Sequence, residues 1–422
     1  MSNPVIKKIV YCIKVALASP LCISKGEGTL TDNDVLLNGE GVPFVPGSSL
    51  TGAMRGYIEK DKQQECIFGY EDMKQKKGRM SSLFVSDLFF DSKVETAVRD
   101  GVKLSDNKTA VSQEKFDMEV VDTGVTGHFY MELWVREQDK EEDLMSQLAQ
   151  VFLGWREKEI RLGSKKTRGY GEIRLLCVKQ KTYDSSNILE YMDAYCAPEN
   201  QDATWADVDL QKLKSEESKY ITLTLPLKLE GGISIRQYIA RKGEPDFEHI
   251  TANGEPVIPG SSFNGALRHR LKEILQQLGA INSKEILDNI FGYVIPSSDS
   301  EARVSHVIVD ECILEGSKRL IMVRNAVSRF EGGSKDGALY REAAFVGGTT
   351  ELVLKVKKTE DAEATIGLLL LVLKDVQNGF LAVGGQTAIG RGLFAANGAL
   401  HISSELPMEK YEKAAFAVIR RA

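Results

Sequence analysis

The residues best suited to chemistry occur twice in this chain. Residues 46–55 read Pro-Gly-Ser-Ser-Leu-Thr-Gly-Ala-Met-Arg, and residues 259–268 read Pro-Gly-Ser-Ser-Phe-Asn-Gly-Ala-Leu-Arg, so seven of the ten positions are identical. The apolar residues that follow the serines have helical spacing, which makes the serines predicted N-caps. Free backbone N–H groups, two hydroxyls and an arginine at a helix N-terminus suit an anion such as phosphate. The candidate anion-binding residues are Ser48, Ser49, Gly52, Arg55, Ser261, Ser262, Gly265 and Arg268.

Gly52 and Gly265 fall inside the two predicted helices. Glycine in a helix interior costs about 1 kcal/mol relative to alanine. Its presence in both copies therefore indicates the close approach of a phosphate, a sugar or a packed strand. The alternative interpretation is a capped helix in tight contact with a strand, without any ligand.

A glycine-rich loop is also duplicated. Leu162-Gly163 through Arg168-Gly169-Tyr170-Gly171 recurs, with the same glycine spacing, as Val383-Gly384 through Ile389-Gly390-Arg391-Gly392. The first loop carries the cations Arg161, Lys165, Lys166 and Arg168, which suit a phosphate chain, whereas the second carries Arg391 alone. We therefore expect unequal contacts from the two halves. The alternative for each loop is a solvated turn.

Further landmarks keep the same order in both halves. Ile67-Phe68-Gly69-Tyr70 recurs as residues 290–293, Arg99 has its counterpart in Arg324, and Glu119 is matched with Glu342. A repeat of this length is a domain, because solenoid repeats run to about 20–50 residues. The predicted organisation is a first domain at 1–179, a linker at 180–217, a second domain at 218–405 and a C-terminal helical tail at 406–422.

The hydrophobic pattern predicts an α+β fold for each half. Residues 6–17 and 219–229 open the halves as strands, and the second helix of each half is expected at 144–155 and 362–376. Short strands precede the Pro-Gly-Ser-Ser segments, and a terminal strand follows each glycine-rich loop. This strand–helix–strand(s)–helix–strand order is that of two tandem ferredoxin-like, RRM-related domains.

Composition limits the function classes. The chain has 422 residues, 42% of them hydrophobic and 27% charged, which is ordinary for a soluble globular protein. The N-terminus lacks the features of a signal peptide, so we expect a cytoplasmic protein without a membrane partner. Six cysteines without a CxxC pair argue against a zinc site and a disulfide framework. The net charge of −6 means that any RNA surface must be a local basic stripe.

No Walker-type phosphate loop is present, and no organic cofactor is expected. The five histidines are dispersed, which does not favour a histidine-based ribonuclease. His249, beside Glu248, is the one histidine for which a role stays open.

Together, the PGSSLxGxxR segment, the middle segment RDGVKLSDNKTAVSQEKFDMEVV and the GSKKTRGYGEI loop resemble the RAMP superfamily of CRISPR–Cas proteins. More narrowly, they resemble backbone subunits of type III (Csm/Cmr) effector complexes, as tandem fusions in the manner of the type III-D branch. The resemblance covers nearly the whole chain. It implies a protein that binds guide RNA through repeated copies of one fold, each with an inserted β-hairpin thumb that displaces a nucleotide of the guide–target duplex. Segments 96–127 and 321–346 are the thumb candidates, with Arg99 and Arg324 as backbone clamps.

The resemblance also implies an endoribonuclease activity. In the family, an aspartate in the loop after the first strand cuts target RNA beside the displaced nucleotide with a divalent metal, here Mg²⁺ or Mn²⁺. The family's Asp-Asn-Pro-Val pattern fits Asp32 to Val35, with Asp34 in place of the proline. Asp32 is the first choice for catalysis and metal binding, with Asp34 in reserve. Asp246 is the positional match in the second half, with Glu248 in reserve.

The partners implied are a CRISPR guide RNA, a complementary target RNA, other RAMP backbone subunits and the large polymerase-like signalling subunit. Three alternatives stay open. The chain could be a catalytically inactive RNA-binding scaffold of the same complex, a nuclease that processes guide precursors, or a protein-binding module with no RNA role. The last of these is favoured only by the acidic composition.

Overall fold

A computed structural model describes residues 3–24, 26, 28, 31–58, 67–72, 74, 76–91, 94, 96–105, 108–191, 205–213, 218–238, 244–293 and 302–421. It divides the chain into two compact units. Unit 1 comprises Met1–Val98, Phe116–Lys166 and Tyr170–Ser218, and unit 2 comprises Arg99–Lys115, Thr167–Gly169 and Lys219–Ala422.

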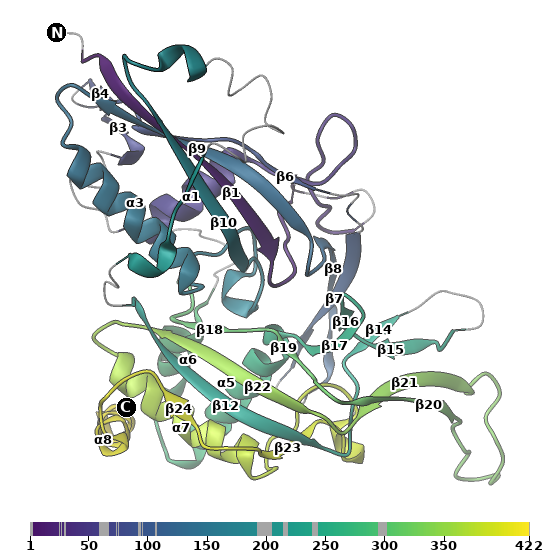
Figure 1. Cartoon of the computed structure of the whole chain (residues 1–422). Helices are drawn as coiled ribbons and strands as arrows, with labels where there is room; N and C mark the ends of the chain where they lie inside the picture. Colours follow the sequence, from purple (N-terminus) through teal and green to yellow (C-terminus); the bar gives the residue numbers. More distant parts are fainter. Residues whose placement is uncertain are drawn as a thin grey trace. The chain divides into compact units, whose positions relative to one another are not determined.

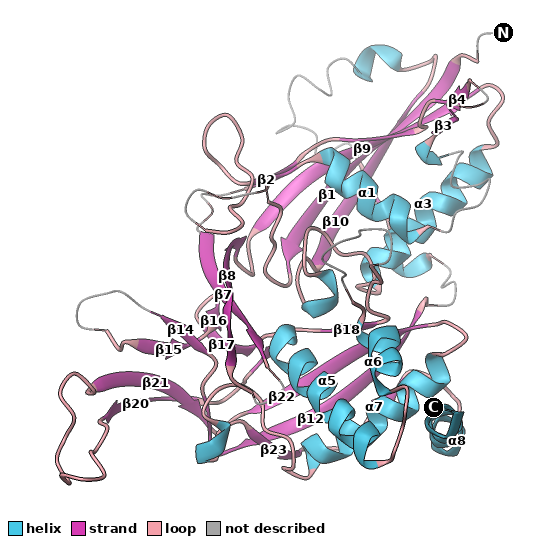
Figure 2. Ribbon diagram, turned by 180° about the vertical axis from the view of Figure 1, so that it is seen from behind, coloured by secondary structure: helices cyan, strands magenta, loops and turns pink. Residues whose placement is uncertain are grey.

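Unit 1 is built on an antiparallel sheet in the order β11-β10-β1-β9-β6-β2, with β5 also paired to β9. The helices α1 and α3 lie on one face of this sheet (Figures 1 and 2). The sheet strands and helices are β1 (Val5–Leu17), β2 (Phe44–Val45), α1 (Gly47–Tyr57), β5 (Leu83–Val85), β6 (Leu88–Phe90), β9 (Thr126–Arg136), α3 (Glu141–Arg156), β10 (Ile173–Tyr183) and β11 (Ala206–Asp207).

The alternation of apolar residues in β1 builds the core of unit 1. Ile9, Tyr11, Ile13, Val15 and Leu17 are buried, and each is two residues from the next, so their side chains share one face of the sheet. They pack in one cluster with apolar residues of α1 and α3. Burial of apolar surface contributes about 25 cal/mol per Å², and this face holds the helices in place.

Unit 2 repeats the arrangement. Its central sheet has the order β18-β22-β12-β23, with β24 also paired to β12, and α5, α6 and α7 lie on one face (Figure 2). Alternate residues of β12 from Ile221 to Leu229 are buried against Phe263 and Leu267 of α5. These elements are β12 (Tyr220–Glu230), α5 (Gly260–Gln277), α6 (Ser283–Phe291), β18 (Val307–Val309), β22 (Thr349–Lys357), α7 (Ala362–Gln377), β23 (Leu393–Ala396), β24 (His401–Ile402) and α8 (Met408–Arg421).

Smaller sheets and hairpins complete the chain. A five-stranded sheet in unit 2 has the order β13-β21-β15-β14, with β20 paired to β21, and a three-stranded sheet has the order β16-β17-β19. β3 pairs with β4, and β7 pairs with β8. Their bounds are β3 (Tyr70–Asp72), β4 (Lys77–Arg79), β7 (Thr96–Leu104), β8 (Ala110–Val121), β13 (Gly232–Ile233), β14 (Arg236–Tyr238), β15 (Phe247–His249), β16 (Thr251–Ala252), β17 (Glu255–Ile258), β19 (Cys312–Ile313), β20 (Lys318–Arg324) and β21 (Tyr340–Val346). Short 3-10 helices lie at η1 (Lys166–Arg168), η3 (Leu210–Lys212) and η5 (Thr387–Ile389).

Both units thus have a mixed α/β architecture, as the sequence predicts. Both thumb candidates contain β-hairpins, β7–β8 and β20–β21. The C-terminal tail forms α8.

The segment predicted as a linker is partly packed on unit 1. β11 pairs with β10, and Trp205 is buried in a cluster with Val10 and Tyr183. The physical cause is the indole ring of Trp205. It would expose a large apolar surface to water if a sheet face did not cover it. Residues 192–204 and 214–217 of the predicted linker lie outside the described residues.

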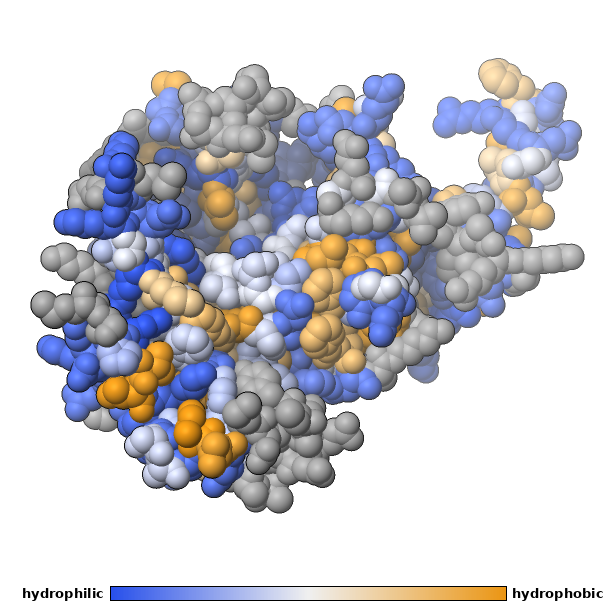
Figure 3. Space-filling model, turned by 90° about the horizontal axis from the view of Figure 1, so that it is seen from above, coloured by the Kyte–Doolittle hydropathy of each residue, from blue (hydrophilic) through white to orange (hydrophobic). Residues whose placement is uncertain are grey.

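No helix in the described part of the chain is long and apolar enough to cross a membrane. On the face shown in Figure 3, hydrophobic residues form separate patches among hydrophilic ones.

Candidate nucleic-acid interface

The duplicated Pro-Gly-Ser-Ser segments begin α1 and α5, but the serines do not cap them. Both helices start at the glycine, their N-caps are Pro46 and Pro259, and neither has a side-chain capping bond. Since proline already fixes the backbone before the first turn, the serines lie within that turn. The expectation of a free N-terminal amide also needs correction in α1, because the Gly47 N–H donates to Asp87 Oδ1 at 2.7 Å.

The glycines of this motif have two different roles. A β-carbon at Gly47 would collide with the backbone oxygen of Val85, and one at Gly260 would collide with that of Val309. These are the tight strand contacts. By contrast, no described atom lies within 4 Å of a β-carbon built at Gly52 or at Gly265. Internal packing therefore explains the first glycine of each motif and leaves the helical one unexplained.

Both helical glycines lie on exposed faces that also carry serine. Ser48 and Gly52 are exposed on α1, and Ser261 and Gly265 are exposed on α5. Residues four apart in a helix share a face, so each half presents a hydroxyl beside bare backbone. Ser49 and Ser262 are partly buried.

The two motif arginines differ. Arg55 is exposed on α1. Arg268 is tied to its own unit, because its guanidinium donates to Asp288 Oδ1 at 2.7 Å and to the Gly292 carbonyl at 3.0 Å. It keeps 38% of its side chain exposed, so it holds the end of α6 while still facing solvent.

The glycine-rich loops have the same backbone in both halves. Gly163, Gly169 and Gly171 have positive φ, as do their counterparts in the second loop, and a β-carbon at Gly171 or Gly392 would collide with a backbone oxygen. The glycines are thus required by the turn itself. Any ligand chemistry must come from the side chains between them.

The two loops differ in the charge that they expose. Lys165, Lys166 and Arg168 are exposed. Arg161 is buried and pairs with Glu172 at 3.0 Å, so it does not belong to the basic stripe. Arg391 is also buried, with 9% of its side chain exposed. The second loop therefore exposes none of the cations predicted for it.

The two first-choice aspartates occupy equivalent positions. Asp117 N–H donates to Asp32 Oδ2 at 2.9 Å, and Arg341 N–H donates to Asp246 Oδ2 at 2.8 Å. Each aspartate precedes a parallel bridge to the strand that carries this N–H, Asn33 to Met118 and Phe247 to Glu342. Both aspartates are exposed. The structure therefore pairs Asp32 with Asp246, as counting along the sequence did.

The same register corrects one pairing. Since Asn33 and Phe247 are equivalent, Met118 takes the place of Glu342, and the match of Glu119 with Glu342 is wrong by one residue. Glu119 instead accepts the Val35 N–H at 3.0 Å.

The reserve carboxylates have partners within the protein. Asp34 is buried and accepts bonds at 2.9 Å from the backbone and hydroxyl of Thr31. Glu248 forms an ion pair with Arg319 at 2.7 Å. Both are committed to holding their loops, which leaves the exposed first choices better placed for chemistry.

Of the two clamp candidates, Arg99 is buried and Arg324 is not. Within unit 2, Arg99 pairs with Glu311 at 3.2 Å and keeps 2% of its side chain exposed. Arg324, at the end of β20, keeps 29% exposed. Beyond it, Phe330 lies in the loop between β20 and β21 and is fully exposed.

A metal ion fits these sites only with help from the RNA. No group of three or more His, Cys, Asp or Glu side chains in the described residues could hold a metal ion. In proteins, Mg²⁺ is usually held by one or two carboxylates together with substrate phosphates and waters. The Asp32 N–H donates to Asp117 Oδ1 and the Asp117 N–H donates to Asp32 Oδ2, so this pair offers two such carboxylates, which fits, whereas Asp246 offers one. Sequence reasoning missed Asp117.

His249 is a structural residue. It is 1% exposed, its Nδ1 accepts the Ile235 N–H at 3.0 Å, and its Nε2–H donates to the Val257 carbonyl at 2.9 Å. Burial lowers its pKa from 6.5 to about 4, against a smaller opposing effect of the bond to Val257. The imidazole is therefore neutral and has both nitrogens occupied, which removes it from the nuclease candidates.

This histidine predicts acid sensitivity. Between pH 6.5 and about 4, His249 is protonated in the unfolded chain but neutral in the folded one. Its contribution to the free energy of unfolding is therefore fully present above pH 6.5 and is lost as the pH falls toward 4. The expected loss is about 2.5 kcal/mol of unfolding free energy between about pH 7.5 and pH 4.5. Urea unfolding at both pH values should show a smaller difference for His249→Gln. The exposed control His401→Gln should match the wild type, and an unchanged difference in His249→Gln would contradict the assignment.

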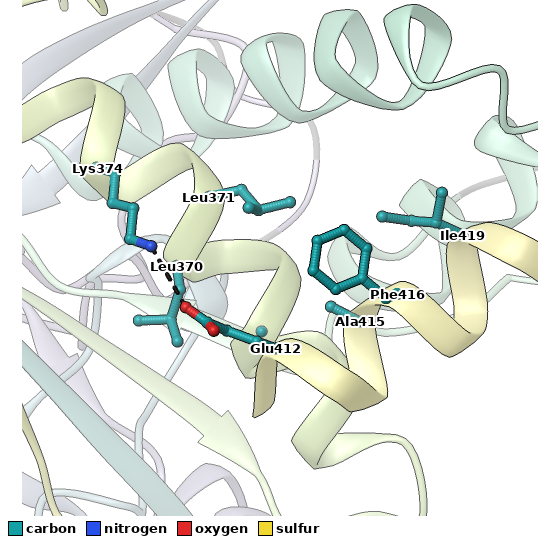
Figure 4. A pocket seen from close by; sticks show the side chains of 8 residues that line it. Leu370, Leu371, Lys374, Glu412, Ala415, Phe416 and Ile419 are labelled. Carbon is teal, nitrogen blue, oxygen red and sulfur yellow. Dashed lines mark hydrogen bonds and ion pairs between the residues drawn. The ribbon is translucent and has the colours of Figure 1, made fainter. Parts of the chain in front are cut away.

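A small apolar pocket lies between α7 and α8. Leu371, Phe416 and Ile419 line it, and Lys374 and Glu412 form an ion pair of 3.4 Å beside it (Figure 4). It holds none of the candidate residues and has no nucleophile or acid–base group apart from this pair.

The family model described as the RAMP superfamily matches residues 14–174 and 225–395. The chain belongs to the RAMP superfamily. The two RAMP matches fall within the two halves predicted from the internal repeat, and they make this a CRISPR-associated RNA-binding subunit. A search of curated proteins found no match.

Proposed function

We propose that this RAMP protein is a guide-RNA-binding backbone subunit of a type III CRISPR effector complex and cleaves target RNA paired with the guide. One observation carries the RNA-binding part most directly. Gly52 and Gly265, which destabilise their helices, face open space beside exposed serines in both halves. A sugar–phosphate chain that passes close to the helix backbone accounts for both.

The cleavage part rests on the aspartates. RNA carries its own nucleophile, the 2′-OH, and a splayed nucleotide permits in-line attack on the adjacent phosphate. As the 2′-oxygen bonds to phosphorus, the bond from phosphorus to the 5′-oxygen breaks, which leaves a 2′,3′-cyclic phosphate and a 5′-hydroxyl that takes its proton from water. Asp32 and Asp246 are exposed, equivalent and held by a backbone N–H through one carboxylate oxygen. The other oxygen can take the proton of the 2′-OH. A divalent ion, held by the carboxylate and the RNA phosphates, would stabilise the charge on the phosphate.

The hairpins β7–β8 and β20–β21 are the proposed thumbs. A fully exposed Phe330 is costly in water and suits stacking on a base, for which aromatic side chains supply about 1–3 kcal/mol. The proposed partners are the guide, the target, further RAMP subunits and the large signalling subunit of the complex.

RNA binding by the full chain tests this proposal. We expect the logarithm of the association constant to fall linearly with the logarithm of salt concentration, with a slope of about −0.7 for each phosphate contact on single-stranded RNA. Replacing Lys165, Lys166 and Arg168 by Gln should reduce the slope by about 2. A charge-matched control with Lys228, Lys410 and Lys413 replaced by Gln should leave it unchanged. Equal slopes in all three proteins would refute the assigned interface.

A further inference from the structure

Unit 2 contains a cluster of arginines around one buried carboxylate. Glu342 has no exposed surface and accepts bonds from Ser234 Oγ at 2.8 Å and Gln386 Nε2 at 3.0 Å. Three guanidinium groups face it: Arg236 Nε at 3.1 Å, Arg324 Nε at 3.1 Å and Arg391 Nη1 at 3.8 Å. Burial alone would raise the pKa of Glu342, but these hydrogen bonds and the charges of Arg236 and Arg391 outweigh it and lower the pKa.

The charges in this cluster do not balance. One carboxylate faces three guanidinium groups, which leaves two positive charges without a described acidic partner. Arg236 and Arg324 keep 33% and 29% of their side chains exposed, so the excess charge reaches the surface. The buried Arg391 has an Nη1 without a hydrogen-bond acceptor among the described residues. Such a cluster lacks the negative charge that would balance its arginines, and a bound anion supplies that charge.

Aromatic rings lie beside the cluster. The Arg236 guanidinium lies 5.0 Å from the ring centroid of Phe247 and 5.9 Å from that of Tyr340. The two rings meet edge to face at 6.0 Å. Phe247 directly follows Asp246, and Tyr340 directly precedes the residue whose N–H holds the Asp246 carboxylate.

Unit 1 has a cation over an aromatic ring at the equivalent place, but from a different segment. By the strand register, Phe116 is the equivalent of Tyr340, and Lys165 lies 4.2 Å from its ring centroid. The Ser164 N–H donates to Cys22 O, and the Gly385 N–H donates to Ser234 O, so Ser24 is the equivalent of Arg236. The first half thus supplies its cation from the glycine-rich loop, and the second half supplies it from β14.

From these observations we infer that Arg236 and Arg324, held by Glu342, form the phosphate-binding site of the second half for single-stranded RNA. In the second half they bind the RNA phosphates that the exposed lysines of the glycine-rich loop bind in the first half. The inference rests on the proposed function and explains why the second loop can lack exposed cations. Excess positive charge beside aromatic rings is the combination that single-stranded nucleic-acid sites use.

The test uses the full chain with a labelled single-stranded RNA of mixed sequence, titrated at several salt concentrations. The double variant Arg236→Gln, Arg324→Gln should bind about tenfold more weakly at low salt, and its salt slope should fall by about 1.4 for two lost contacts. The charge-matched control Arg303→Gln, Arg420→Gln should keep the wild-type affinity and slope. Both control arginines are exposed and lie outside the arginine cluster and the proposed thumbs.

Thermal unfolding of each variant separates binding from folding. If the double variant is unstable, Arg236→Lys with Arg324→Lys keeps both charges and should retain the slope. Wild-type affinity and slope in a folded double variant would overturn the inference and leave the cluster as a structural device. In that case, a loss of affinity in Lys165→Gln, Lys166→Gln would preserve the proposed function, whereas a wild-type chain that does not bind RNA would defeat both.

Discussion

Asp32→Asn should abolish cleavage of target RNA at one set of sites, and Asp246→Asn should abolish it at another. Asparagine keeps an oxygen that can accept the N–H of Asp117 or of Arg341, so the loops should stay folded. It loses the charge that takes a proton or holds a metal ion. General acid–base groups contribute about 10²–10⁴-fold, so each rate should fall at least about a hundredfold.

The assay uses the assembled complex with guide RNA, complementary target and Mg²⁺, and resolves the products by length. Glu244→Gln is the matched control, because Glu244 is an exposed carboxylate two residues before Asp246. It should cut at the wild-type rate. If both asparagine variants cut at every site as the wild type does, the aspartates are idle and the chain is an RNA-binding scaffold.

Asp32→Asn also separates the two halves. Because Asp117 lies beside Asp32 and Arg341 takes the equivalent place beside Asp246, the first half offers the better site for a metal ion. The sites that depend on Asp32 should therefore need less Mg²⁺ than those that depend on Asp246.

Much of the fold could be predicted because the chain repeats itself. The alternation in residues 6–17 and 219–229 and the helical spacing after Pro-Gly-Ser-Ser are local signals, and both produced the expected elements. The prediction that the serines cap these helices was wrong for a local reason. A proline before the first turn moved the start of each helix and left the serine hydroxyls without that role.

The fate of individual arginines could not be predicted, because their partners are distant in sequence. Arg99 pairs with Glu311 and Arg391 faces Glu342, and the sequence around each arginine gives no indication of its carboxylate partner. Arg236 was missed for a related reason. Its equivalent in the first half is Ser24, so a comparison of the two copies does not single out Arg236.

The central claim is that RNA lies against the exposed faces of α1 and α5. It predicts that Gly52→Leu and Gly265→Leu both raise the free energy of unfolding and weaken RNA binding. Leucine in a helix is more favourable than glycine by nearly 1 kcal/mol, and no described atom lies close enough to clash with its β-carbon. The same side chain would fill the space that the sugar–phosphate chain needs.

Gln276→Leu is the matched control, since it adds leucine to an exposed position of α5 about 16 Å further along the helix than Gly265. It should alter neither property by much. The double glycine variant should unfold at a higher urea concentration than the wild type.

The most direct measurement is the affinity of the Gly52→Leu, Gly265→Leu chain for single-stranded RNA, compared with its unfolding free energy. We predict a chain that is more stable by about 1–2 kcal/mol and binds RNA at least about tenfold more weakly. A more stable chain that binds RNA as tightly as the wild type would show that the RNA does not touch these helices.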